Sequence, residues 1–421
     1  MAAVSSKAKK RQTKPPKSRP QATSSLSQPA VEDAWSSTIL SVFSPSADLF
    51  ALLSLAVDKH RLRVYDVNVN RVVFEHVVNG ARVTSLAWIK LNATESSSSI
   101  KKNDVSPSRK RKKVDNETAS SATPNATPDI LALALGLSNG KVQIFSIDQG
   151  RVLKTLSDNM SSAPIVAVLG ANDLKIPQCI WTSSADGTLR LWDVQKGEIL
   201  SASQGGTPYT ALASRPGVEH MLAANTTIQL LSTDFIATNP TDSSNTHSPK
   251  QLCTFSGHAS AVKALRWDFT SSPPKRFFSS AEEDRFVYIW EISDSDSAKG
   301  KMVASCPLDT EVRQIESSSL FGKQLLLILS SSGKITLSPV PAELMASSSH
   351  KSSSKQQIPT LLPRSTISLA EKKSTADVHV LSASFIPSSE GSIRIALLSG
   401  GVRLAFETVV CWLTLACIDH S

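Results

Sequence analysis

One short pattern recurs along the chain and restricts what it can fold into. Each copy begins with a short apolar stretch, passes through a turn of small or acidic residues, and continues into an alternating strand that often ends in an aromatic residue. The clearest copy runs from Trp181 through Asp186-Gly187 to Trp192-Asp193. Apolar residues two positions apart share one face of a strand, whereas a helix requires spacings of three and four. The pattern therefore predicts β-structure throughout.

The other copies keep the alternation even where the turn or the aromatic residue changes. The copy at Asn225–Leu230 lacks both the glycine and the aromatic residue. Apolar residues separated by one position, which follow the turn in the other copies, are Leu62/Val64, Val142/Ile144, Leu189/Leu191, Val287/Ile289, Ile335/Leu337 and Val402/Leu404. We expect these side chains to be buried against a neighbouring sheet, because period-two alternation places them on one face.

The copies resemble WD repeats, the four-stranded blades of β-propellers, whose period is about 40–45 residues. The best match opens with Gly257-His258 and closes with Trp290-Glu291, where the family has Trp-Asp. The resemblance implies a buried hydrogen-bond network that fixes each blade, and we therefore interpret His258 as structural rather than catalytic. The matching positions are His258, Ser280, Asp284 and Trp290 in the fifth copy, and Asp186 and Trp192 in the third.

The repeats predict an all-β fold, a seven-bladed WD-repeat β-propeller over residues 36–410. The blades are expected at Ser36–Val78, Ala81–Leu156, Ala163–Ser203, Thr207–Thr238, Gly257–Ser305, Asp309–Pro341 and from Val378 to near the end. Two low-complexity segments interrupt them, a disordered basic insert at residues 92–128 and a Ser-rich loop at residues 346–373. Residues 1–35 are predicted to be a disordered basic tail.

The end of the chain departs from the pattern. Residues 411–421 have no recognisable continuation of the last blade. An unpaired strand edge is an aggregation hazard, so a propeller needs a full set of strands in its last blade. We therefore expect this end to be truncated or replaced. Whether the seventh blade closes does not follow from the sequence.

The net positive charge lies outside the repeats. Although the net charge is +9, residues 1–30 hold seven lysines and arginines without an acidic residue, and residues 101–113 hold seven more beside Asp104. Such runs can be simply solvated, but five consecutive cations also match a nuclear import signal and attract phosphate backbones. No aromatic residue is interleaved with them, so any RNA contact would be electrostatic. The five cations are Arg109, Lys110, Arg111, Lys112 and Lys113.

No catalytic constellation occurs in the sequence. It has no Gly-x-Ser-x-Gly elbow, no phosphate-binding glycine loop and no His-Glu-x-x-His. The five cysteines lack zinc-ligand spacing, and the apolar runs are too short to span a membrane. We therefore predict a non-enzyme with no cofactor, no metal, no small-molecule substrate and no membrane partner.

A narrower resemblance covers the chain up to about Val410. Its features are the basic tail and insert, Phe43-Ser-Pro45 with Arg61–Asp66, and the late segments Ser384–Arg394 and Ser399–Glu407. Together they resemble the fungal members of the WD-repeat-43 / U3 small-nucleolar-RNA-associated WD-repeat family, which belongs to the t-UTP (UtpA) subcomplex of the small-subunit processome.

This second resemblance implies a scaffold of the nucleus and nucleolus that supports pre-rRNA transcription and processing and small ribosomal subunit biogenesis. It implies as partners the other WD-repeat subunits of the t-UTP subcomplex and pre-rRNA or a small nucleolar ribonucleoprotein. Family members also carry a helical C-terminal assembly domain, which is absent from this chain. The alternatives are another nuclear WD-repeat adaptor, in chromatin or a ubiquitin ligase, and an enzyme built on a propeller, which would need polar residues converging at the central channel.

Overall fold

Strands form all of the regular elements in the part of the chain that the structure describes. The structure is a computed structural model, and the described residues belong to one unit, Ile39–Ser421. The described ranges are 40–56, 59–92, 129–170, 178–234, 249–292, 300–320, 323–340, 358–361, 365–367, 380–386, 393–400 and 404–411. The predicted tail at residues 1–35, the interior of the basic insert and residues 412–421 lie outside these ranges.

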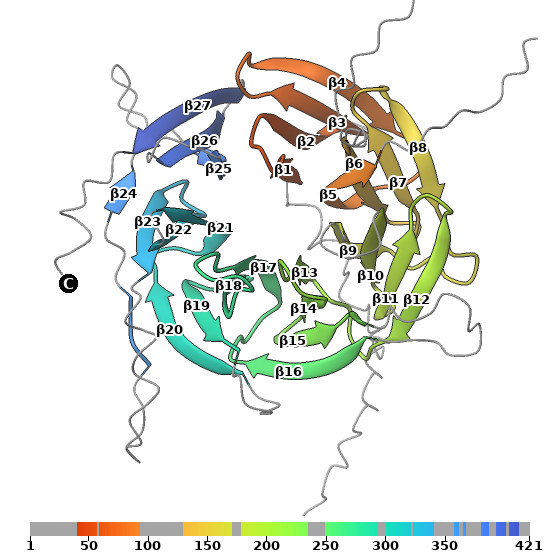
Figure 1. The fold of residues 1–421 in the computed structure, drawn as a ribbon. Coiled ribbons are helices and arrows are strands. Elements are labelled where there is room, and N and C mark those ends of the chain that lie inside the picture. Colours follow the sequence, from red (N-terminus) through yellow and green to blue (C-terminus); the bar gives the residue numbers. More distant parts are fainter. Residues whose placement is uncertain are drawn as a thin grey trace, which may run out of the picture. The chain divides into compact units, whose positions relative to one another are not determined.

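The strands form seven antiparallel sheets that follow one another along the chain (Figure 1). The first four sheets contain β1 (Ser41–Phe43), β2 (Leu49–Ala56), β3 (Lys59–Asp66) and β4 (Arg71–Val78); β5 (Val83–Asn92), β6 (Asp129–Leu137), β7 (Val142–Ser146) and β8 (Arg151–Leu156); β9 (Ile165–Gly170), β10 (Cys179–Ser184), β11 (Thr188–Asp193) and β12 (Glu198–Gln204); and β13 (Ala211–Ser214), β14 (His220–Ala224), β15 (Thr227–Ser232) and β16 (Lys250–Ser256).

The last three sheets include one that has only three strands within the described residues. They contain β17 (Val262–Trp267), β18 (Arg276–Ala281), β19 (Phe286–Glu291) and β20 (Lys301–Pro307); β21 (Val312–Leu320), β22 (Lys323–Ser330), β23 (Ile335–Val340) and β24 (Ser365–Ile367); and β25 (Val380–Ile386), β26 (Ile393–Gly400) and β27 (Leu404–Cys411).

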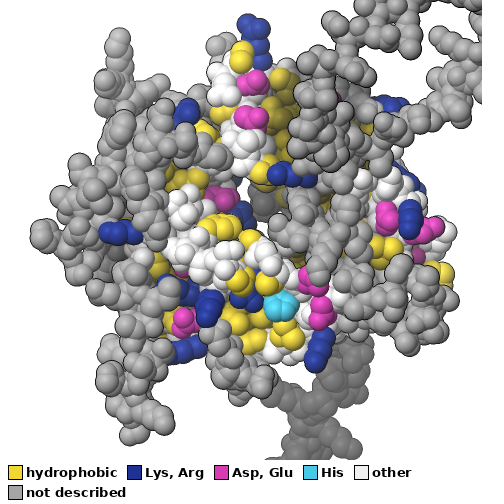
Figure 2. Space-filling view, viewed as in Figure 1, with side chains coloured by type: hydrophobic (Ala, Val, Ile, Leu, Met, Phe, Trp, Pro, Cys, Tyr) yellow, Lys and Arg dark blue, Asp and Glu magenta, His cyan; other side chains and the backbone are white. Residues whose placement is uncertain are grey.

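The seven sheets are arranged in a ring (Figure 1). On the face of this ring that Figure 2 shows, the basic and acidic side chains of the described residues are scattered and do not gather in one patch. In every sheet the first strand is innermost and the later strands follow outward in chain order. Each innermost strand contacts the innermost strands of the two neighbouring sheets, and β1 contacts β25 as well as β5. The first and the last sheets are therefore neighbours, which closes the ring.

Alternation along the strands places the core between successive sheets. Phe277 and Trp290 belong to a cluster shared with the fourth sheet, whereas the adjacent Phe278 belongs to a cluster shared with the sixth. A sheet buried on both faces needs apolar side chains at consecutive positions, as β18 has. The alternating residues expected to be buried are buried in the structure, except that the side chains of Val402 and Leu404 lie outside the described part.

Side chains near the ring centre link neighbouring sheets through hydrogen bonds. The Thr210 hydroxyl donates to the carbonyl oxygen of Val262 at 2.7 Å. The Gln314 amide donates to the carbonyl oxygen of Ala383 at 2.8 Å. These bonds run from the fourth sheet to the fifth and from the sixth to the seventh, so the ring is held by polar contacts as well as by apolar packing.

The structure confirms the all-β, seven-bladed architecture and differs from the expected boundaries in two places. The fourth sheet takes its outer strand from β16, which begins well beyond the expected end at Thr238. Within the Ser-rich loop at residues 346–373, β24 pairs with β23 and residues 358–361 pair with β20. Serine-rich composition obscured these pairings, because a backbone hydrogen bond at a sheet edge requires little from the side chains.

Candidate functional site

The fifth sheet contains a buried polar network around His258, which we call the His258 network. Ser279 on β18 accepts a hydrogen bond from the indole nitrogen of Trp290 on β19, with a nitrogen–oxygen distance of 2.7 Å. The same hydroxyl lies 2.7 Å from Nε2 of His258, and Nδ1 of His258 lies 3.5 Å from the carboxylate of Asp284. The last distance indicates an electrostatic contact rather than a short hydrogen bond.

The serine of this network is Ser279, so the assignment to Ser280 is wrong by one position. Phe277 pairs with Trp290 across the two strands, and both contribute to the same apolar cluster. Side chains two positions apart share a face, so Ser279 lies on the face of Trp290 and Ser280 on the opposite one. Counting alternation from Phe277 would have identified Ser279 from the sequence.

The surroundings of His258 favour its neutral form. Burial lowers the pKa of His258, and the nearby Asp284 carboxylate only partly opposes this effect. Because an indole nitrogen can only donate, the Ser279 proton is free to point to Nε2 of His258, which leaves the Nδ1 proton directed at Asp284. Nε2 of the ring is thus hydrogen-bonded within the blade and Nδ1 faces the Asp284 carboxylate without a short hydrogen bond, which supports a structural role.

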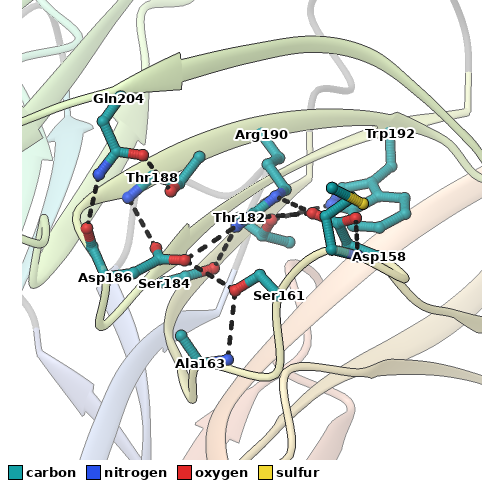
Figure 3. A network of polar contacts seen from close by, with 11 residues as sticks. Asp158, Ser161, Ala163, Thr182, Ser184, Asp186, Thr188, Arg190, Trp192 and Gln204 are labelled. Atoms are coloured by element: carbon teal, nitrogen blue, oxygen red, sulfur yellow. Dashed lines mark hydrogen bonds and ion pairs between the residues drawn. The ribbon is translucent and has the colours of Figure 1, made fainter.

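The third sheet replaces this arrangement with a network centred on Arg190, here called the Arg190 network (Figure 3). Thr182 accepts a hydrogen bond from the Trp192 indole nitrogen at 2.9 Å, as Ser279 does from Trp290. The guanidinium group of Arg190 lies 3.0 Å from Asp158 and 3.6 Å from Asp186. Its side chain is only 7% exposed, so both ion pairs are largely shielded from water.

A serine occupies the place of the histidine in the Arg190 network. Ser161 precedes Thr182 by the same 21 residues that separate His258 from Ser279, and it donates to the Asp186 carboxylate at 2.7 Å. Burial alone would raise the pKa of Asp186, but hydrogen bonds from Ser161 and Thr188 and the charge of Arg190 outweigh burial and lower it.

Sequence reasoning found Asp186 and Trp192 but missed the other members of the Arg190 network. Arg190 lies in a strand whose alternating pattern reads as ordinary, and Asp158 lies 32 residues earlier. One signal was available in the sequence. Ser161 precedes Thr182 by the same number of residues as His258 precedes Ser279. The partnership of Arg190 with two carboxylates from different loops is a tertiary feature that local pattern does not encode.

The Arg190 network holds the loop at residues 157–164, and this loop presents an exposed methionine. Asp158 accepts a hydrogen bond from the Met160 backbone nitrogen at 2.8 Å while its other oxygen binds Arg190. Ser161 accepts one from the Ala163 backbone nitrogen at 3.3 Å. Met160 is 92% exposed. A rigid loop with an exposed apolar tip is suited to contact another protein, because little entropy is lost when it binds.

The described residues contain no cluster suited to a metal ion, and two of the buried thiols are poor nucleophiles. They hold no group of three or more histidine, cysteine and acidic side chains that could bind a metal ion. Burial raises the pKa of Cys179 to about 12 and that of Cys306 to about 11, so both thiols remain protonated and weakly nucleophilic. The described residues include no helix long and apolar enough to cross a membrane.

The predicted targeting or RNA-contacting cations, Arg109 to Lys113, lie outside the described residues. The two ends of the segment that contains them are placed, because Asn92 at the end of β5 pairs with Asp129 at the start of β6. The segment is thus an insertion in a hairpin between the first two strands of the second sheet. The structure gives no geometry for the cations themselves.

Comparison with known proteins agrees with this architecture. Residues 249–291 match the family model described as WD domain, G-beta repeat, and this stretch contains the whole His258 network. The fold is a WD-repeat β-propeller. Each of its seven sheets is a blade, and the His258 network lies in the fifth.

The propeller is also similar to solved structures. A chain from the crystal structure of the mitotic checkpoint complex is similar with a TM-score of 0.51 and 13% identity, over 87% of this chain and 89% of that chain. In total 1440 solved chains match, so the likeness defines the architecture without selecting a function. No curated protein matches the sequence of the chain.

Proposed function

We propose that this propeller is a non-enzymatic scaffold that binds other proteins within a nucleolar assembly. The observation that carries the scaffold role is the Met160 loop, in which a buried arginine and two carboxylates fix a loop whose apolar tip faces solvent. Loops on a rigid framework are the usual interaction sites of such domains. The WD-repeat architecture is of the scaffold type and supports the same role.

We further propose that the assembly is the small-subunit processome. The resemblance of the basic tail, the basic insert and the late segments to the U3-associated WD-repeat family supports this assignment. The partners would be the WD-repeat subunits of the t-UTP subcomplex, through protein contacts, and pre-rRNA, through the cations Arg109 to Lys113. The proposed location is the nucleolus.

Affinity purification tests the assembly. The tagged chain is recovered from nuclear extract, and the eluate is probed for pre-rRNA and for other WD-repeat processome subunits. Recovery of both supports the proposal. Recovery of chromatin or ubiquitin-ligase subunits instead would favour a different nuclear adaptor, the alternative reading. Recovery of neither set would contradict the assignment to the processome.

The Met160 loop is tested in the same purification. Met160→Ser is expected to reduce recovery of protein subunits without changing the thermal unfolding midpoint, because the side chain contributes almost nothing to the core. Val69→Ser is the matched control, since Val69 is also an exposed apolar residue in a turn, at 56% exposure. If both variants reduce the recovery of protein subunits equally, or if neither reduces it, Met160 is not the contact.

The basic insert is tested separately by localisation. Replacement of Arg109 to Lys113 by alanine is expected to reduce nuclear accumulation of a fluorescent fusion while the propeller stays folded, because the segment lies between β5 and β6 and outside both. The control replaces Lys7, Lys9 and Lys10 of the tail by alanine. Unchanged localisation of the insert variant would assign targeting to the tail or to a partner.

A further inference from the structure

A segment between the last two strands of the sixth blade lies against the outer strand of the fifth. After β23 ends at Val340, residues 358–361 run beside β20, and the chain then reaches β24 on the sixth blade (Figure 1). We call this segment, Ile358–Leu361, the strap. Thr360 of the strap forms a parallel bridge with Ser305, whereas all of the named strands pair in antiparallel fashion.

Two backbone hydrogen bonds attach the strap to a single residue of β20. The Ser305 amide donates to the Pro359 carbonyl oxygen at 3.1 Å, and the Leu361 amide donates to the Ser305 carbonyl oxygen at 2.8 Å. A backbone amide has only one proton, so Ser305 cannot use it to pair with β19. The outward amide and carbonyl of Ser305 therefore form an edge that accepts an added strand.

One apolar side chain accompanies the two hydrogen bonds. Leu361 is partly buried and packs against the cluster between the fifth and sixth blades, which includes Phe278 and Val340. Ile358, at the other end of the strap, is 44% exposed. Among the described residues, the strap is thus held by two backbone hydrogen bonds and one leucine, and a segment with so few contacts can exchange with a competitor.

The sequence of the strap limits how far the pairing extends. Proline has no amide proton, so Pro359 can offer its carbonyl oxygen to Ser305 but cannot continue the ladder toward the start of β20. The recognition chemistry is consequently short. It needs a carbonyl oxygen, an amide two residues later, and a leucine at the position of that amide.

We infer that the outer edge of β20 at Ser305 is a docking site for an extended protein segment with a leucine two residues after the accepting carbonyl, and that the strap is its resident occupant. A partner segment of this chemistry binds by displacing the strap, and so the strap competes with the partner. The inference goes beyond the proposed function, since it does not depend on which assembly contains the propeller.

The test uses a labelled peptide with the sequence of residues 355–364 as its probe. It is added to the full chain and to a variant in which Ile358→Gly, Pro359→Ser, Thr360→Gly and Leu361→Ser weaken the strap, because they remove its leucine and increase the flexibility of its backbone. Fluorescence anisotropy is expected to show binding to the variant at least about ten-fold tighter than to the unmodified chain, where the resident strap competes. Equal affinities, or no binding to a variant whose thermal unfolding is unchanged, would overturn the inference.

Two matched controls link binding to the edge itself. A peptide with an N-methyl group on the Leu361 amide loses only the bond to the Ser305 carbonyl, and it is expected to bind the variant at least about ten-fold more weakly. Ser305→Pro in the strap variant removes the outward amide and leaves the antiparallel ladder with β19, so it should abolish binding of the unmodified peptide. Retained binding in both controls would contradict docking at Ser305.

The intact chain provides an independent readout. In Leu361→Ser, the backbone amides at positions 305 and 361 are both expected to exchange hydrogen about ten-fold or more faster than in the unmodified chain. The amides that pair β18 with β19 are expected to keep their protection. Unchanged exchange at Ser305 would show that the strap does not protect this edge.

Discussion

Single side chains decide how well a blade is fixed, and Ser279 is the clearest case. Its hydroxyl hydrogen-bonds to both the indole nitrogen of Trp290 and the ring of His258. Ser279→Ala should lower the free energy of unfolding by about 1–3 kcal/mol, because the buried indole nitrogen of Trp290 loses its acceptor. Urea denaturation measures the change. Ser280→Ala is the matched control. An equal or larger loss of unfolding free energy in that variant would indicate that Ser280, and not Ser279, is the serine of the network.

The buried indole itself carries more stability than its hydrogen bond. Trp290 packs against Phe255 with the ring centroids 5.7 Å apart, and it is among the largest fully buried side chains. Trp290→Ala should cost about 3–5 kcal/mol of folding free energy. The expected result is a clear drop in the thermal midpoint, and a midpoint equal to that of the unmodified chain would contradict the placement of this residue.

Substitution of Arg190 should affect a loop that lies outside its own strand. Arg190→Gln leaves Asp158 and Asp186 without their guanidinium partner, and breaking such a largely buried pair costs about 3–5 kcal/mol. Because Asp158 also accepts from the Met160 amide, exchange at that amide should accelerate as well. Lys196→Gln serves as the control, since its pair with Asp193 is largely exposed on the lysine side. If the Met160 amide keeps its protection from hydrogen exchange in Arg190→Gln, the Arg190 network does not hold the loop.

At the scale of elements, the inner strands are joined by few but specific side chains. Gln314 on β21 donates to the Ala383 carbonyl oxygen and accepts from both the Ala383 amide and the Ser382 hydroxyl on β25. Gln314→Ala should therefore increase hydrogen exchange at Ala383 by roughly ten-fold, which corresponds to about 1.4 kcal/mol. Ser319→Ala on the exposed end of the same strand is the control. Equal exchange in the two variants would mean that apolar packing alone joins β21 to β25.

The elements also show what local sequence can and cannot indicate. Alternation predicted strands such as β11 and β19 because apolar side chains two positions apart share one buried face, which leaves a direct trace in residue order. The strap and β24 left no such trace, since their pairing uses backbone groups at an edge within a Ser-rich stretch. In the candidate site, Asp186, His258, Asp284 and Trp290 could be aligned to a repeat, but Arg190 and Asp158 meet only once two loops have folded together.

The whole propeller should lose stability in mildly acidic solution. Burial is the first cause that lowers the pKa of His60, His76, His220 and His258, and Arg82 and Arg215 add to it for His60 and His220. In the unfolded chain these groups bind protons near pH 6.5, whereas in the folded chain they do so only at lower pH. Stability is therefore complete above about pH 6.5 and falls as the pH decreases from there toward the folded pKa values.

Denaturation at two pH values measures this effect. The free energy of unfolding should be lower at pH 5.5 than at pH 7.5, with each histidine contributing at most about 1.4 kcal/mol per pH unit. His220→Gln should make the dependence shallower, because glutamine does not bind a proton in either state. Equal or greater stability at pH 5.5 would contradict the directions of these shifts.

The contact between β1 and β25 determines how many apolar faces are exposed when one blade is removed. An open row of stacked repeats can lose a terminal unit and sacrifice only one shared face. A closed ring has no terminal unit, so seven blades share seven faces, and removing any blade exposes two of them. Shortening this propeller by one repeat should therefore not yield a slightly less stable protein of the same kind. The remaining blades would have to close around a smaller circle or leave two apolar faces in water.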